Sequence, residues 1–139
     1  GQGPDENKLK KLIKRLNLQK SVVMKNWQNN MSKYYLNSKL LIFPSLYEGL
    51  PNTILDALNY SLPCISTKCS GAEDILSKNY KYFIQNHNSK KLSQMMSKAI
   101  MNYDKILNST KKEHKKLQRF LVLNQVNKYL NFLSTILEK

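Results

Sequence analysis

Arginine is scarce in this chain. The sequence has 23 basic residues and a formal net charge of +14, yet Arg15 and Arg119 are its only arginines and the other basic residues are lysines. Proteins that recognise nucleic acid rely on arginine forks and on aromatic side chains interleaved with the charge. Because neither pattern is present, we do not expect a nucleic-acid partner. A solvated lysine surface is the first interpretation of the charge, and an anionic membrane surface is the alternative.

Histidine and cysteine are equally few. His87 and His114 lie far apart in the sequence, Cys64 and Cys69 are five positions apart, and no Asp-x-Asp pair occurs. None of these spacings is usual for a metal site, so we expect neither a bound metal nor a cofactor. The cysteines are typical of free thiols in a reducing, cytoplasmic compartment. Cys64 stands in a candidate strand, where a small buried hydrophobe is its expected role.

Long apolar runs are also missing, since no stretch approaches the roughly 20 residues that cross a membrane. Instead, short apolar runs alternate with helical patterns. Strands are predicted near residues 22, 41, 64 and 82, and each is followed by a helix. This alternation predicts an α/β fold, with a Rossmann-like parallel sheet covered by helices on both faces.

The chain is organised around its second predicted strand. Residues 40–43 form a continuous apolar run that ends at Pro44, as expected of a buried parallel strand. Gly49 and Pro51 then break the chain, Asn52 is a favourable N-cap, and residues 54–58 have the apolar spacing of a short helix. In such a unit the loop leads from the carboxyl end of a strand to the amino end of a helix, where free N–H groups favour an anion.

Two acids flank this predicted anion site. Glu48 lies in the loop, and Asp56 lies eight positions later, about one turn inside the helix. We expect both carboxylates to face one crevice, because ligands of open parallel sheets bind outside the carboxyl ends of the strands. A ligand with hydroxyls at both ends and phosphate between them, such as a nucleotide sugar, fits this arrangement.

These residues resemble the donor-site signature of family 4 retaining glycosyltransferases, which have the two-domain GT-B fold. That signature has a Glu, seven residues, a second Glu, a small-apolar-small triplet and a Pro-Val-Ile-Ser-Thr strand, and here Asp56 stands in place of the second Glu. The resemblance extends over most of the chain and is carried by Gly1–Pro4, Tyr34–Tyr35 with Ser38, Glu48–Leu58, Leu62–Thr67 and Ser70–Leu76.

The resemblance implies a role for each matched residue. Glu48 would bind hydroxyls of the donor sugar and act as the catalytic carboxylate, Asp56 would hold the ribose hydroxyls, and Glu73 would lie near the nucleotide. Amides at the helix entrance would bind sugar or phosphate oxygens. The full set of expected donor-binding residues is Gly49, Leu50, Pro51, Asn52, Thr53, Asp56 and Glu73.

By the same resemblance, we expect the parent enzyme to transfer a sugar from a nucleotide-sugar donor to a glycan or lipid-linked acceptor with retention of anomeric configuration. Surface polysaccharide or glycoconjugate synthesis is the implied setting, in the cytoplasm or peripherally on the cytoplasmic face of the membrane. The alternative is a non-catalytic module that binds a nucleotide sugar. A catalytically inactive fragment is expected if the chain stands alone.

The resemblance also sets expectations about boundaries. Residues 1–139 are interpreted as a partial nucleotide-sugar-binding domain, with 117–139 as a C-terminal helix of the crossover type. The family's first strands, its Gly-Arg-Leu loop and its acceptor-binding N-terminal domain have no counterpart here. Three arrangements therefore stay open for the predicted strand at residues 21–25: it pairs directly with the strand near 41, another chain fills the gap, or an upstream piece completes the sheet.

Overall fold

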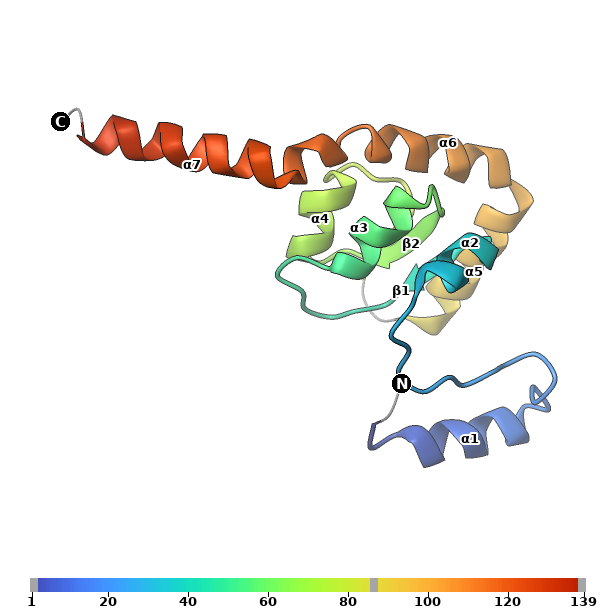
Figure 1. Ribbon diagram of the computed structural model, residues 1–139. Helices are drawn as coiled ribbons and strands as arrows, with labels where there is room; N and C mark the ends of the chain where they lie inside the picture. Colours follow the sequence, from blue (N-terminus) through green and yellow to red (C-terminus); the bar gives the residue numbers. More distant parts are fainter. Residues whose placement is uncertain (1–2, 86–87, 138–139) are drawn as a thin grey trace. The chain divides into compact units, whose positions relative to one another are not determined.

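The computed structural model describes residues 3–85 and 88–137. Its contacts divide the chain into two compact units, Gly1–Lys33 and Tyr34–Lys139. The helices and strands of both are drawn in Figure 1. The second unit contains the sheet and the candidate site.

The first unit contains one helix, α1, which spans Glu6–Arg15. It is amphipathic, and Lys10 pairs with Glu6 one turn earlier at 2.6 Å. The strand predicted at residues 21–25 is wrong, because this segment is irregular and Val23 is 70% exposed. The physical reason is that a strand needs a neighbour to receive its backbone hydrogen bonds, and no described residue pairs with this segment.

A short helix, α2, spans Ser32–Asn37 and leads toward the sheet. Tyr35 is its buried residue, and the Tyr35 ring stacks on that of Tyr60 with centroids 5.4 Å apart. Burial raises the pKa of the Tyr35 hydroxyl, and the negative charge of Asp56 raises it further. The phenol therefore stays neutral and can donate a hydrogen bond beside the α3 carboxylate.

The sheet has three parallel strands in the order β1-β2-β3, formed by Leu41–Phe43, Cys64–Thr67 and Phe83–Ile84. Ile42 pairs with Ile65, and Thr67 pairs with Ile84. All four residues of β2 are buried. Because alternate side chains point to opposite faces, this burial means that helices cover both faces of the central strand. The predicted α/β parallel sheet is confirmed (Figure 1).

Four helices pack around these strands. They are α3 (Asn52–Asn59), α4 (Ser70–Leu76), α5 (Ser89–Met101) and α6 (Tyr103–His114). The largest fully buried apolar side chains come from the sheet and the helices together: Ile54, Leu58, Ile65, Ile75, Leu76 and Ile106. This set forms one core that fixes the strand ends relative to the helix ends.

The sequence pattern predicts a break at residues 108–116, but the chain breaks only at the end of this range, at residues 115–116. Helix α6 continues to His114 because Ile106 and Thr110 are fully buried within it. The Thr110 hydroxyl donates to the Ile106 carbonyl oxygen at 2.9 Å, which satisfies the polar group inside the core. The chain breaks at Asn102, between α5 and α6, and again after His114.

The C-terminal segment consists of a 3₁₀ turn, η1 (Leu117–Phe120), and a long helix, α7 (Val122–Leu137). The Arg119 guanidinium donates to the carbonyl oxygens of Asp74 and Ile75, which attaches η1 to the end of α4. The helix expected over residues 117–139 begins only at Val122, after the 3₁₀ turn, and none of the side chains within Val122–Leu137 is buried. Among the described residues, no helix is both long enough and apolar enough to cross a membrane.

A buried hydrogen bond joins β2 to the segment before β3. The Tyr80 hydroxyl donates to the Cys64 carbonyl oxygen at 2.7 Å, and both side chains lie in the core. Cys64 is fully buried, as expected. Burial raises the pKa of the Cys64 thiol and of the Tyr80 hydroxyl far above their ordinary values.

These raised pKa values predict a loss of stability in alkali. Unfolded Cys and Tyr release protons above about pH 8.5 and 10, while the buried groups keep theirs, so the native state binds more protons and stability falls as pH rises. Each group accounts for at most about 1.4 kcal/mol per pH unit. Urea titrations between pH 7 and 11 measure the slope.

The variant Tyr80→Phe separates the two groups. At neutral pH it should cost roughly 1 kcal/mol through the lost hydrogen bond. Above pH 10 its stability should fall less steeply than that of the unchanged chain, because one of the groups that keep their protons in the native state is gone. Equal slopes would contradict the assignment to Tyr80.

Candidate functional site

The loop that carries Glu48 follows β1 and precedes α3. Ser45 begins the loop, and its hydroxyl donates to Glu48 Oε1 at 2.8 Å. Glu48 is half-buried. The bond fixes one carboxylate oxygen and leaves the other available, so the loop presents an acceptor of defined orientation near the carboxyl end of β1.

The neighbouring strand holds this loop in place. Thr67 ends β2, and its hydroxyl donates to the carbonyl oxygen of Ser45 while lying 3.4 Å from that of Phe43. Four residues after Thr67, the Gly71 amide donates to the Glu48 carbonyl oxygen at 3.2 Å. The loop is therefore attached at two points, Ser45 and Glu48, to the end of β2 and the start of α4.

Gly71 permits this attachment because it has no side chain. A Cβ placed there would lie 2.6 Å from the Glu48 carbonyl oxygen and closer still to that of Gly49. Both neighbours are backbone atoms, which cannot swing aside as a side chain can. Gly49 is different, since a Cβ at that position meets nothing within 4 Å. Close approach, and not chain flexibility, is what requires glycine at 71.

The loop ends at the first turn of α3. Pro51 is buried and takes the N-cap position, so the prediction of Asn52 as the cap is wrong: Asn52 is the first helical residue, and no side chain caps the helix. Within the described ranges, the amides of Gly49, Leu50, Asn52 and Thr53 donate no hydrogen bond to protein. These free donors and the helix dipole together favour an anion at this position.

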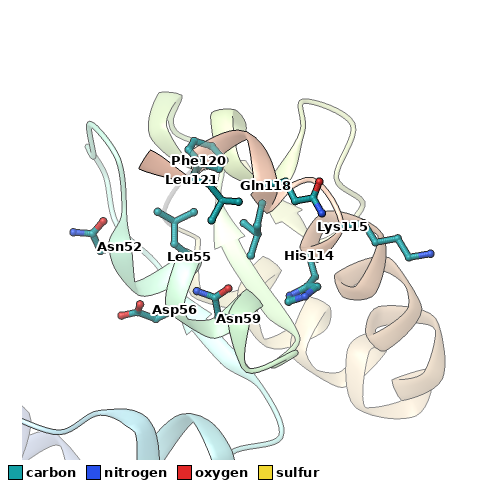
Figure 2. Close-up of a pocket in the computed structure, with 10 residues that line it drawn as sticks. Asn52, Leu55, Asp56, Asn59, His114, Lys115, Gln118, Phe120 and Leu121 are labelled. Carbon is teal, nitrogen blue, oxygen red and sulfur yellow. The ribbon is translucent and has the colours of Figure 1, made fainter. Parts of the chain in front are cut away.

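Asp56 is exposed and lies one turn further along α3. It lines a pocket of about 630 Å³ with three other residues of that helix, Asn52, Leu55 and Asn59. Figure 2 shows the Asn52 and Asp56 side chains projecting on one side of α3. Glu48 is not among the residues that line this pocket. Asn52 therefore connects the pocket with the Glu48 loop, because it lines the pocket and is also the first residue of the helix that follows the loop.

The opposite wall of the pocket comes from the end of α6 and from η1, and sequence reasoning missed it. His114 Nδ1 lies 2.7 Å from the Leu58 carbonyl oxygen, and since that oxygen can only accept, Nδ1 is the donor. This bond ties α6 to α3. The other lining residues are Lys115, Leu117, Gln118, Phe120 and Leu121 (Figure 2). Their distance from residues 52–59 along the chain leaves no local signal that could have identified them.

Glu73 lies in the first turn of α4, two residues after Gly71. Its carboxylate is 3.4 Å from Lys68 Nζ, and its side chain is 24% exposed. The structure thus brings Glu48 and the first turn of α4 into contact through Gly71, and it places Asp56 in the separate hollow beside η1. In the part of the chain that the structure describes, no group of three or more His, Cys, Asp or Glu residues could hold a metal ion.

The fold and the loop define a class: a parallel α/β domain in which the loop after β1 leads to free backbone amides at the entrance of α3. The glycosyl transferases group 1 family matches residues 1–117. Because the match covers most of the chain, the protein belongs to the glycosyl transferases group 1 family.

Known relatives agree with this membership. An uncharacterised glycosyltransferase of Methanocaldococcus jannaschii is 47% identical over 77 residues, which are 55% of this chain and 19% of that protein. The Campylobacter jejuni N-acetylgalactosamine-N,N'-diacetylbacillosaminyl-diphospho-undecaprenol 4-alpha-N-acetylgalactosaminyltransferase is 26% identical over 94% of this chain and 37% of its own length. The Escherichia coli UDP-Gal:alpha-D-GlcNAc-diphosphoundecaprenol alpha-1,3-galactosyltransferase is 27% identical over 81% and 30%.

Among solved structures, the GtfA/B complex contains a chain that matches all of this one with a TM-score of 0.78. The identity is 18%, and the match covers 29% of that chain, so the likeness concerns the fold. It supports the expected GT-B architecture. The chain thus spans between 19% and 37% of the length of these proteins.

The contact at Gly71 predicts a specific defect. Gly71→Ala should destabilise the chain by about 1–3 kcal/mol, because the new methyl group must displace the Glu48–Gly49 backbone. Gly49→Ala adds the same group where nothing lies within 4 Å and should stay within roughly 0.5 kcal/mol of the unchanged chain. Urea unfolding of both variants gives the comparison, and equal stability of the two would contradict the close approach.

Proposed function

We propose that the protein containing this chain transfers a sugar from a nucleotide-sugar donor to a glycan or lipid-linked acceptor, with retention of configuration at the anomeric carbon. The observation that carries this proposal is the Glu48 carboxylate, which Ser45 holds at 2.8 Å in the same loop that leads to the free amides at the entrance of α3. A carboxylate and anion-favouring amides in one loop suit a ligand that joins a sugar to a diphosphate.

In this proposal Glu48 binds hydroxyls of the donor sugar through the carboxylate oxygen that Ser45 leaves available. The same negative charge stabilises the positive charge that develops on the sugar ring as its bond to the leaving group lengthens. The attachment of the loop to Thr67 and Gly71 supports this role, because a carboxylate on a fixed loop needs no reorganisation when the charge develops.

The leaving group is assigned to the helix entrance. Amides of Gly49, Leu50, Asn52 and Thr53 bind sugar or phosphate oxygens there, and Pro51 keeps the entrance rigid because its backbone angle is fixed. These groups stabilise the negative charge that collects on the diphosphate as it departs. Glu73, in the first turn of α4, is assigned to the nucleotide end of the same ligand.

The reaction needs no separate acid or base in this assignment. The bond from the anomeric carbon to the diphosphate oxygen breaks, and the electron pair leaves with the nucleoside diphosphate. A hydroxyl of the acceptor forms the new bond on the same face of the sugar, and its proton passes to the departing diphosphate. The products are the glycosylated acceptor and the nucleoside diphosphate, so atoms and charge balance without a further reactant.

Asp56 is assigned to the ribose hydroxyls. Its exposed carboxylate projects from α3 on the same side as Asn52, which supports one ligand that reaches from the helix entrance to the pocket beside η1 (Figure 2). Aspartate is one methylene shorter than the family's glutamate, so the ribose must lie close to α3. The relatives named for diphosphoundecaprenol-linked substrates favour a lipid-linked acceptor, and with it a site of action at a membrane surface.

Titration of the full chain with a panel of nucleotide sugars and free nucleotides tests the assignment. One donor should bind saturably, and Glu48→Gln and Asp56→Asn should each weaken binding about tenfold or more, since each removes a charged hydrogen-bond partner. Asp104→Asn is the matched control, because Asp104 is another exposed aspartate on a helix of the same unit and lines neither the pocket nor the loop. It should bind as the unchanged chain does.

The outcomes separate binding from catalysis. The site assignment would be overturned if neither Glu48→Gln nor Asp56→Asn weakened donor binding, or if a folded chain bound no nucleotide sugar. Binding by the parent protein without release of nucleoside diphosphate in the presence of acceptor would identify a non-catalytic binding module. Where transfer occurs, the anomeric proton coupling of the product decides whether configuration is retained.

A further inference from the structure

A second pocket, far from the Glu48 loop in the fold, is lined mainly by lysine. It has a volume of about 420 Å³, within the range of small-ligand sites. Lys105 and Lys112 come from α6, Lys98 comes from α5, and Lys81 precedes β3. The remaining lining residues are Tyr82, Asn108 and Ser109.

The helical spacing explains how these residues meet. Lys105, Asn108, Ser109 and Lys112 lie at positions i, i+3, i+4 and i+7 of α6, so they form one stripe along that helix. Helices α5 and α6 pack against each other, and the pocket lining shows that Lys98 of α5 reaches the same hollow. Tyr82 is 6% exposed, and its burial holds the neighbouring Lys81 in position.

The charges of this pocket are unbalanced. No Asp or Glu contributes to its lining, and none of the four lysines forms an ion pair with a described residue. Each additional ammonium group raises the local positive potential, and a concave wall focuses that potential. A ligand with two or more negative charges would relieve the repulsion among four lysines, whereas a neutral ligand would not.

The pocket is distinct from the proposed donor site. Lys81 and Tyr82 directly precede β3, at the amino end of that strand, whereas the Glu48 loop follows the carboxyl end of β1. In a parallel sheet these two ends lie on opposite edges. A ligand bound by the lysines therefore neither competes with the donor nor depends on the proposed function.

We propose that this four-lysine pocket (Lys81, Lys98, Lys105 and Lys112) is a binding site for phosphate groups. Ammonium groups are compact charges on flexible stems, so they suit a phosphate that is approached from several sides. The Asn108 amide and the Ser109 hydroxyl add neutral donors at the same wall. The phosphates come either from the headgroups of an anionic lipid surface or from a soluble diphosphate, and the experiment distinguishes these two sources.

The test uses the full chain with the double variant Lys105→Ala/Lys112→Ala. Binding to phosphatidylglycerol vesicles is measured by co-sedimentation against phosphatidylcholine vesicles, and binding of inorganic diphosphate is measured by calorimetry. The matched control is Lys90→Ala/Lys128→Ala, which removes the same charge from exposed positions on α5 and α7 that do not line the pocket. Circular dichroism confirms that both variants are folded.

Because a lysine near an anionic surface contributes roughly a fivefold change in affinity, the pocket variant should bind phosphatidylglycerol vesicles about 30-fold more weakly, while the control changes much less. Loss of diphosphate binding in the pocket variant, without any vesicle binding by the unchanged chain, identifies the soluble ligand instead. Equal losses in the pocket variant and the control would overturn the proposal, because net charge alone would explain them. A folded chain that binds neither probe would overturn it as well.

Discussion

The close contact between Gly71 and the Glu48–Gly49 backbone is the constraint on which the candidate site depends. It joins the loop after β1 to the segment after β2. The Thr67 hydroxyl adds a second attachment to the same loop, and Thr67 directly follows Ser66, which pairs with Phe83 in the sheet. Because both attachments go to backbone atoms, they fix the position of the loop whatever side chains it carries. The carboxylate of Glu48 then needs one further bond, from Ser45, to acquire a defined orientation.

That contact is possible because β2 is buried on both faces. A central parallel strand with helices on each side brings the carboxyl ends of its neighbours to a single edge, where the loops after β1 and β2 must pass close together. The core that surrounds β2 extends to Ile106 in α6, so the helices that follow β3 are part of the same packing. The stability of the core and the position of the Glu48 loop therefore rest on the same buried strand.

The same topology places acidic and amide groups at one end of the strands and lysines at the other. Acidic and amide groups gather where β1 and β2 end, and they suit a ligand with hydroxyls and phosphate. Lysines gather beside the beginning of β3, between α5 and α6. A glycosyltransferase domain that bound its donor at one edge and phosphate groups at the other could engage a charged surface without obstructing its own crevice. The net charge of +14 does not by itself indicate a ligand, whereas the positions of the lysines in the fold do.

The sequence by itself determined the strands near 41, 64 and 82, a short helix over residues 54–58 and the loop residues from Glu48 to Pro51, because these depend on local apolar runs, turn residues and spacing. Only the tertiary structure decided the rest. Residues 21–25 have the composition of a strand, but no described residue pairs with them. Residues 108–114 look like the start of a polar break but continue α6, because Thr110 is buried. The η1 wall of the Asp56 pocket and the four-lysine pocket join residues distant in sequence. The stripe on α6 repeats at helical spacing, but nothing along the chain indicates that packing places it beside Lys81 and Lys98.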